Sequence, residues 1–247
     1  MGLFGFFKQQ TSNKKALDIS KIKVDMHSHL IPGIDDGAKN MEETIALLAK
    51  FESLGYSKII TTPHIKNPSY PNTSATILSG LNEVRKEMKA VGITLTLEAA
   101  AEYYFDETFL EKVKNRDVLT FGDNYVLFEF SFYHAPSFEE VLFDELIKAG
   151  YKPVIAHFER YLYFLGSIEK AVEWRKRGVN IQINLLSLTG HYGLEIKKQA
   201  EMLIDACEFD FVGSDCHRME HLTLLEASLT LPQLEKLNNY LLKNKSL

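Results

Sequence analysis

The sequence predicts an α/β protein whose parallel sheet closes into a (β/α)7-type barrel. Short apolar runs alternate with amphipathic segments, at spacings that fit βαβ units. Polar side chains also gather where the apolar runs end, and barrel active sites form at the carboxyl ends of the strands. The 247 residues suffice for one such domain, so we assign 22–247 to the barrel and 1–21 to an N-terminal tail that we expect to be flexible.

The first expected strand, 22–26, is an apolar run with β-branched residues. The helix after it should begin at Asn40, which forms a capping box with Glu43, and end at Gly55. Later apolar runs predict strands at 58–62, 93–98 (continuing into 101–104), 125–129, 153–157, 179–183 and 209–212. Helical spacing of apolar residues, often with glycine after the segment, predicts helices at 73–90, 106–115, 137–149, 167–177, 193–207 and 231–244.

Composition excludes several classes of protein. The net charge of −5 and the pI near 5.9 provide no basic face, so nucleic acid is not an expected partner. No run of about 18 apolar residues is present, so we expect no membrane span. Cys207 and Cys216 are too few for a disulfide framework and fit the reducing cytosol, so we expect a cytoplasmic protein.

Two histidines, His27 and His29, follow directly on the first expected strand. Residues i and i+2 of a strand point to the same side, so both imidazoles can reach one metal ion. Each further candidate, taken alone, could be an ordinary loop or core residue, but chance explains the whole set poorly. These candidates are Asp36 in the loop after the first strand, His64, Glu98 or Glu102, Glu129, His157, Asp215 and His217.

This set predicts a centre with more than one metal ion. Nine nitrogen and oxygen donors exceed what one four- to six-coordinate ion can use, so we expect two or three divalent ions. Imidazoles and carboxylates without thiolates suit manganese, iron or zinc. Four carboxylates buried together would repel one another without cations. We therefore expect the protein to lose stability when its metal is removed.

Seven motifs follow one another in a fixed order across residues 22–220. They are Asp25-Met26-His27-Ser28-His29, Asp35-Asp36-Gly37, Thr62-Pro63-His64, Ala101-Glu102-Tyr103-Tyr104, Phe128-Glu129-Phe130, Ala156-His157-Phe158-Glu159-Arg160-Tyr161 and Ser214-Asp215-Cys216-His217. This ordered set resembles the PHP (polymerase and histidinol phosphatase) superfamily. Within it, the motifs look most like those of the CpsB/YwqE-type bacterial manganese-dependent protein-tyrosine phosphatases.

The resemblance implies a distorted (β/α)7 barrel with a trinuclear site, in which manganese is the expected metal. It also implies hydrolysis of phosphotyrosine by a metal-bridging hydroxide. The substrate would be the tail of a bacterial tyrosine kinase that controls capsule or exopolysaccharide synthesis. The ligands carry over, with Glu102 in preference to Glu98, onto His27, His29, Asp36, His64, Glu102, Glu129, His157, Asp215 and His217.

Arginine and histidine residues near these motifs are candidates for substrate binding. Arg160 could clamp a phosphate with two hydrogen bonds, or could form a structural salt bridge. The family tends to carry a second arginine several residues after its last motif, whereas Arg218 here directly adjoins His217, and its role stays open. His134 and His191 are loop histidines that could donate a proton to the leaving group.

Two other functions stay open. One is a small-molecule phosphoesterase acting on histidinol phosphate or a nucleotide. A deep enclosed pocket would favour this function. The other is a noncatalytic metal-binding scaffold for polysaccharide assembly, which would not need so complete a ligand set. A rim open enough to admit a peptide would favour the protein phosphatase. A homo-oligomer is compatible with the sequence, which gives no signal either way.

Overall fold

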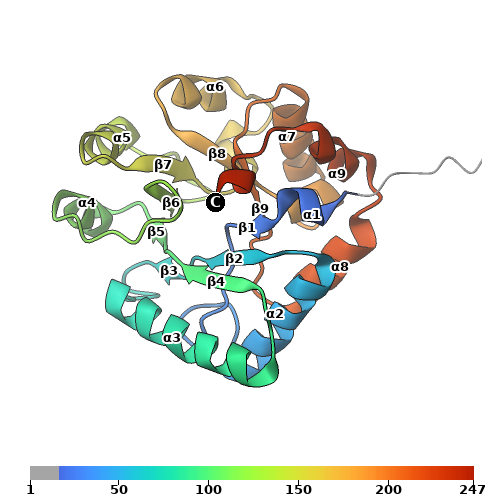
Figure 1. The fold of residues 1–247 in the computed structure, drawn as a ribbon. Helices are drawn as coiled ribbons and strands as arrows, with labels where there is room; N and C mark the ends of the chain where they lie inside the picture. Colours follow the sequence, from blue (N-terminus) through green and yellow to red (C-terminus); the bar gives the residue numbers. More distant parts are fainter. Residues whose placement is uncertain (1–16) are drawn as a thin grey trace, which may run out of the picture.

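A computed structural model describes residues 17–247, and nine strands in it curl about a common axis with helices outside them (Figure 1). Neighbouring strands in the two sheets are paired in parallel. The predicted α/β fold of the barrel type is confirmed. The strands are β1 (Val24–Asp25), β2 (Lys58–Thr61), β3 (His64–Ile65), β4 (Thr96–Ala99), β5 (Glu102–Tyr104), β6 (Tyr125–Glu129), β7 (Lys152–Ile155), β8 (Asn180–Asn184) and β9 (Phe211–Gly213).

The structure has nine strands where seven were expected, because a short strand follows the expected strand 58–62 and the strand expected over 93–104 is interrupted. β2 ends before Pro63 and β3 starts after it, because proline has no N–H to donate to a neighbouring strand. The adjacent strand breaks at 100–101, between β4 and β5. The two breaks lie side by side and divide the sheet into the orders β1-β2-β4 and β3-β5-β6-β7-β8-β9. The third expected strand also starts later than predicted, at Thr96.

The first and last strands meet through the residues that follow them. Ser28 and Cys216 form an isolated parallel bridge. The His29 amide donates to the Cys216 carbonyl across 2.9 Å, and the Asp215 amide donates to the His27 carbonyl across 2.8 Å. Backbone pairing thus continues from β9 to β1, and it does so at residues predicted to bind metal.

The helices follow the expected order, apart from the two ends of the described chain. The α-helices are α1 (Ile19–Ile22), α2 (Met41–Leu54), α3 (Ser74–Val91), α4 (Glu107–Lys114), α5 (Glu139–Lys148), α6 (Glu169–Lys176), α7 (Leu194–Asp205), α8 (Met219–Ser228) and α9 (Pro232–Lys236). Short 3-10 helices are η1 (Phe158–Arg160), η2 (Leu162–Phe164), η3 (Leu185–Thr189), η4 (Leu237–Asn239) and η5 (Lys243–Ser246). No helix within residues 17–247 is both long and apolar enough to cross a membrane.

At the start of the described chain, the expected strand 22–26 is wrong in its bounds. Ile22 ends helix α1, and Lys23 adopts φ +64°, which turns the chain before β1 begins. His27 and His29 therefore follow a two-residue strand and do not lie on it. Leu17 and Ile19 are buried, so packed structure starts before residue 22, while residues 1–16 of the expected tail lie outside the described residues.

Two further expectations about helices need correction. The predicted helix 231–244 is wrong, because the chain forms α9 and then short 3-10 turns over a stretch containing three asparagines, which are poor helix formers. Helix α8 was not predicted, since its leucines do not mark one face. At α2, the Asn40 side chain accepts a hydrogen bond from the Glu43 amide, as expected. The Glu43 carboxylate accepts one from the Lys39 amide and not from the Asn40 amide, so the capping box is half formed.

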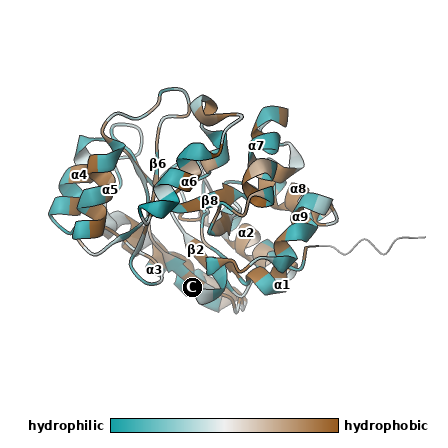
Figure 2. Ribbon diagram, turned by 90° about the horizontal axis from the view of Figure 1, so that it is seen from above, coloured by the Kyte–Doolittle hydropathy of each residue, from teal (hydrophilic) through white to brown (hydrophobic). Residues whose placement is uncertain are grey.

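Side chains of the strands alternate between two cores. On β6, Tyr125 and Leu127 belong to a small buried cluster inside the curled sheet, whereas Val126 and Phe128 belong to the large core under the helices. The helices turn their apolar residues to that large core, and Figure 2 shows hydrophilic and hydrophobic colours alternating around them. Glu129 continues the inner row of β6, directly beyond Leu127. The small cluster therefore forms an apolar floor beneath the polar strand ends.

Candidate metal centre

The loop after β1 is organised by Asp35. Its carboxylate accepts hydrogen bonds from His29 Nδ1 at 2.8 Å, from the Gly37 amide at 3.0 Å and from the His64 amide at 3.1 Å. Asp35 thus shapes the turn and also orients a histidine ring. With its Nδ1 proton donated to Asp35, His29 keeps Nε2 free to face the other candidates.

Two glycines permit the close approach of the histidine-bearing segments. A Cβ atom on Gly37 would lie 2.2 Å from the carbonyl oxygen of His29. A Cβ atom on Gly213 would lie 2.7 Å from the Cβ of His27. No larger residue fits at either position without moving a histidine. The ring centroids of His27 and His29 lie 5.5 Å apart, although neither residue is on a strand.

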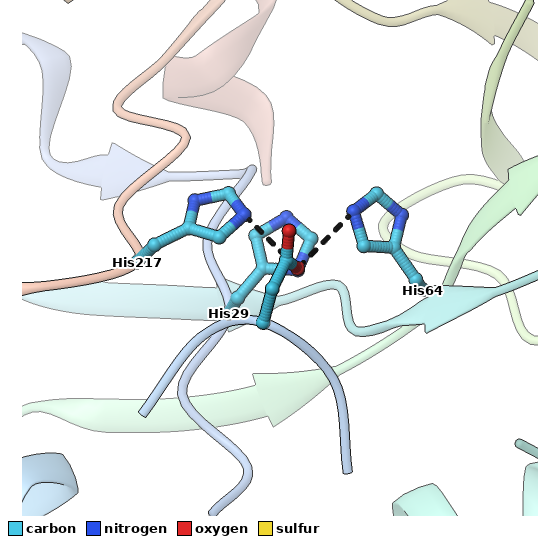
Figure 3. A group of neighbouring side chains, drawn as sticks. His29, His64 and His217 are labelled. Atoms are coloured by element: carbon cyan, nitrogen blue, oxygen red, sulfur yellow. Dashed lines mark ion pairs between the residues drawn. The ribbon is translucent and has the colours of Figure 1, made fainter. Parts of the chain in front are cut away.

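The candidate donor atoms gather in four groups, and within each group the atoms lie within 4.8 Å of one another. His29, His64 and His217 meet in one group (Figure 3), where His64 and His217 pair with Asp36 at 3.6 and 3.4 Å. The other three groups are His27, His29 and Asp215; His27, Glu102 and His157; and His64, Glu102 and Glu129. Each of the four groups shares one residue with each of two others, through His27, His29, His64 or Glu102. Together the groups contain all nine predicted residues and nothing else from residues 17–247.

The charges of these groups are strongly coupled. Burial alone would lower the pKa of His27, but the negative charges of Glu102 and Asp215 outweigh burial and raise this pKa to about 9. Burial, followed by the charge of Glu102, raises the pKa of Glu129 to about 8. Without metal, protons on neighbouring groups therefore compensate the buried carboxylates. Divalent cations would compensate the same charge more completely.

Three buried histidine nitrogens have no hydrogen-bond partner among the described residues. They are His29 Nε2, His64 Nδ1 and His157 Nδ1. Each belongs to at least one of the four groups, and buried polar atoms are rarely left unpaired without a reason. His29 Nε2 lies 3.4 and 3.5 Å from two carboxylates and His64 Nδ1 lies 3.3 and 3.7 Å from two, so their lone pairs fit a divalent ion. His157 faces the carboxylates through its other nitrogen, Nε2. The residues present are thus compatible with the metal centre that the sequence predicts.

Two of the candidates have strained backbones. His157 adopts φ +35° and Asp215 adopts φ +51°, in the left-handed region that side chains with a Cβ atom rarely enter. Such conformations cost on the order of 1 kcal/mol or more, and they persist where the surroundings hold them. The His157 amide donates to Gln182 Oε1 at 2.8 Å, and the Asp215 amide donates to the His27 carbonyl at 2.8 Å. The strain turns both side chains inward at the ends of their strands.

Members of all four groups line a cavity of about 440 Å³. The guanidinium of Arg160 lies on its wall, 4.4 Å from the ring centroid of Phe132 and 4.2 Å from that of Tyr192. Tyr70 forms another part of the wall and stacks on His64 with 5.4 Å between the centroids. Cationic and aromatic side chains therefore surround the candidate ligands in the cavity.

The remaining candidates from the sequence lie at the edge of the cavity or outside it. Arg218 and His191 are exposed side chains at the cavity wall, and Arg218 Nε lies 3.3 Å from His221 Nε2. His134 is exposed and is not among the cavity residues. Glu98 pairs with Lys58 at 2.8 Å and also lies outside the cavity lining, whereas Glu102 is buried within it. The structure thus separates the two glutamates between which the strand pattern could not decide.

Residues 23–241 match the family model described as capsular polysaccharide synthesis, CpsB/CapC. The chain belongs to this family. It is similar to tyrosine-protein phosphatase YwqE of Bacillus subtilis (strain 168), with 31% identity over 198 residues that cover 80% of this chain and 78% of YwqE. It is also similar to tyrosine-protein phosphatase CpsB of Streptococcus pneumoniae, with 29% identity over 203 residues, 80% of this chain and 84% of CpsB.

Solved structures resemble this CpsB/CapC family member at two levels. One is a crystal structure from work on YwqE of B. subtilis and CpsB of S. pneumoniae, described as unique metal-dependent tyrosine phosphatases. It matches with a TM-score of 0.75 and 29% identity, over 90% of this chain and 94% of that one. The histidinol phosphate phosphatase of Lactococcus lactis matches with a TM-score of 0.53 and 13% identity, over 88% and 94% of the two chains, which shows a shared fold.

Sequence reasoning missed several residues that support the site in this family member. Gln182 and Asn184 on β8 hydrogen-bond to the candidates around them, and Lys66 lies on the cavity wall 3.6 Å from Glu129. One signal was present in the sequence: amides alternate with isoleucines at Asn180, Gln182 and Asn184, so the three amides point to the same side of the strand. Lys66 carries no such signal, because a lone lysine in a loop is usually solvated.

Proposed function

We propose that this chain is a metal-dependent phosphatase that hydrolyses phosphotyrosine in proteins. The observation that carries the proposal is the set of nine donors in four overlapping groups, with Arg160 on the wall of the same cavity. The family and the named activities of YwqE and CpsB support the same activity. We place the protein in the control of capsule or exopolysaccharide synthesis and propose the tail of a bacterial tyrosine kinase as its substrate.

The metal ions would be held by the nine residues at the strand ends. The overlap of the four groups suits two or three divalent ions, and the mixed imidazole and carboxylate donors favour manganese, with iron or zinc as alternatives. When bound, such ions supply a nucleophile from water at neutral pH and neutralise the charge of the phosphoryl oxygens. The chain's own side chains then have to bind and orient the substrate.

Arg160 is suited to bind the phosphoryl group. Its guanidinium has five N–H donors, and one of them, on Nη1, donates to Asp215 at 2.9 Å. The aromatic rings of Phe132 and Tyr192 on either side restrict its rotation. Because its plane is fixed before substrate arrives, less conformational entropy is lost on binding. The two interpretations of Arg160, a phosphate clamp and a structural salt bridge, are therefore compatible.

The mouth of the cavity favours a protein substrate over an enclosed small molecule. Ser69, His191 and Arg218 line the cavity and are exposed to solvent, so its rim is part of the molecular surface. A phosphotyrosine side chain could enter from a peptide that stays outside. Tyr70 offers an aromatic face on the wall against which the tyrosyl ring could pack.

One comparison of substrates tests this proposal. Purified protein is supplied with Mn²⁺ and assayed on a phosphotyrosine peptide, the matching phosphoserine peptide and histidinol phosphate. We expect the highest kcat/KM for the phosphotyrosine peptide, because only this substrate combines the aromatic ring with an extended chain. A preference for histidinol phosphate would identify a small-molecule phosphoesterase. No turnover of any of the three, in protein that binds Mn²⁺, would favour the scaffold.

A further inference from the structure

β8 carries no candidate metal ligand. Its neighbours β7 and β9 lead to His157 and Asp215. β8 instead places two fully buried amides, Gln182 and Asn184, on the same side of the strand. A buried amide is costly unless both its oxygen and its nitrogen are hydrogen-bonded, so the bonds of these two side chains reveal what they do.

The bonds of Gln182 have a fixed direction. The backbone N–H of His157 meets the Gln182 amide at 2.8 Å, and a backbone N–H can only donate, so the atom it meets is oxygen. The same oxygen, Oε1, lies 3.1 Å from His27 Nδ1 and accepts the proton of that nitrogen. His27 therefore keeps Nε2 for the centre, where Glu102 and Asp215 lie 3.1 and 3.5 Å away.

The direction continues through Asn184. The NH₂ group of Gln182 donates to Asn184 Oδ1 at 2.8 Å, so the other end of Asn184 is its NH₂ group. That group donates to Asp215 Oδ2 at 2.7 Å. Arg160 donates to the same oxygen, which leaves Asp215 Oδ1 facing His27 and His29 at 3.5 Å from each.

We propose that Gln182 and Asn184 form an amide relay that fixes which atoms of His27 and Asp215 face the metal ions. This inference rests on the proposed function, since it concerns the same centre. The two amides are positioning residues and touch neither metal nor substrate. One peptide N–H sets the direction of the whole relay, so His27 presents Nε2 and Asp215 presents Oδ1 before any metal arrives. Partners that orient metal ligands in this way typically contribute tenfold to a hundredfold in affinity.

The test uses Gln182→Met, which keeps the length and burial of the side chain but removes both hydrogen-bonding ends. Gln199→Met is the matched control. Gln199 is equally buried on α7 and uses both ends of its amide, on the Gly166 amide at 2.8 Å and the Ser167 carbonyl at 2.6 Å, away from the cavity. Metal-free wild type and both variants are titrated with Mn²⁺ by calorimetry, and their thermal unfolding is followed in parallel.

We expect Mn²⁺ to bind Gln182→Met roughly tenfold to a hundredfold more weakly than wild type, and to bind Gln199→Met with unchanged affinity. Asn184→Leu removes the bonds of Asn184 to Gln182 and Asp215. If Gln182→Met does not fold, Mn²⁺ binding by Asn184→Leu tests the relay instead. In a variant that carries both Gln182→Met and Asn184→Leu, the fold-loss in Mn²⁺ affinity should be smaller than the product of the two single fold-losses, because one break already disorders the relay.

Four outcomes contradict the relay. Unchanged Mn²⁺ affinity in Gln182→Met, or an equal loss in Gln199→Met, would show that the amide only fills space. Losses that multiply in the double variant would show that the two amides act separately. Wild-type protein that binds no Mn²⁺ would contradict the relay and the proposed function together, whereas normal wild-type binding with unaffected variants contradicts the relay alone.

Discussion

Arg160 donates a hydrogen bond to Asp215 across 2.9 Å and so joins the turn after β7 to the turn after β9. The bond neutralises part of the charge of a buried carboxylate and holds the guanidinium against the cavity wall. It uses one of five N–H groups, and the others are available to a phosphoryl group at the open side. The ion pair and the binding of substrate can therefore be separated by experiment.

Arg160→Met should lower kcat/KM for a phosphotyrosine peptide by about tenfold to a hundredfold, since charge-assisted hydrogen bonds contribute roughly 1.5–3 kcal/mol. KM should rise as part of this loss. Arg175→Met is the control, because Arg175 pairs with Asp210 and Glu208 outside the cavity and should affect stability alone. Unchanged kinetics in Arg160→Met, with a lowered Tm, would reduce Arg160 to a structural residue.

Glu102→Gln should abolish turnover and weaken Mn²⁺ binding, because Glu102 belongs to two of the four donor groups. Its Oε1 lies 2.9 Å from His157 Nε2, and its Oε2 lies 3.1 Å from His27 Nε2. Glu98→Gln is the control, since Glu98 is partly exposed and pairs with Lys58. The measurements are the metal content per chain and kcat. If Glu98→Gln were the inactive variant, the choice between the two glutamates would be wrong.

Removal of metal should lower both activity and stability. A ligand present at 100 times its Kd stabilises a protein by about 2.7 kcal/mol, which corresponds to roughly 5–10 °C in Tm for a chain of this size. Dialysis against a chelator should therefore lower Tm by this amount, and Mn²⁺ should restore Tm and turnover together. A chelated protein with unchanged Tm, or with fewer than two transition-metal ions per chain before chelation, would contradict a polynuclear centre.

Glu159 should make the protein less stable as the pH rises. Its carboxylate is fully buried, and burial raises its pKa from 4.5 to about 7, although Ser187 Oγ and the Asn184 amide donate to Oε1 at 2.5 and 3.0 Å. The folded state thus binds this proton more tightly than the unfolded state does. Stability from Glu159 is complete below the unfolded pKa and is lost as the pH rises through the folded value.

The variant for this test is Glu159→Gln, whose oxygen can still accept both hydrogen bonds. With Mn²⁺ in constant excess, its Tm should fall less than that of wild type between about pH 5 and pH 8. Part of the fall should persist, because burial also raises the pKa of Asp25 to about 7. Glu42→Gln, at an exposed position on α2, should follow wild type. Equal slopes for wild type and Glu159→Gln would contradict the prediction.

The sequence predicted the fold and the candidate residues well where periodicity or motif order carried the information. β6 matches its predicted bounds, because five consecutive buried residues between turns leave little choice. Helix α8 and the break-up of 231–244 were missed, since tertiary packing there overrides weak local preferences. Gln182 and Asn184 escaped notice for a different reason. Their alternate positions indicate only that they share a side of the strand, whereas their importance lies in hydrogen bonds to residues far away in sequence.

Gly37 and Gly213 determine how mutational scans of this protein should be interpreted. Neither has a side chain, yet any substitution would push against His29 or His27 at distances no real Cβ atom tolerates. In a saturation library scored for phosphatase activity, both positions should be as intolerant as the histidines themselves. Intolerance at these two sites would report a steric limit on backbone approach, so a map of essential positions drawn from such a library will be larger than the set of residues that do the chemistry.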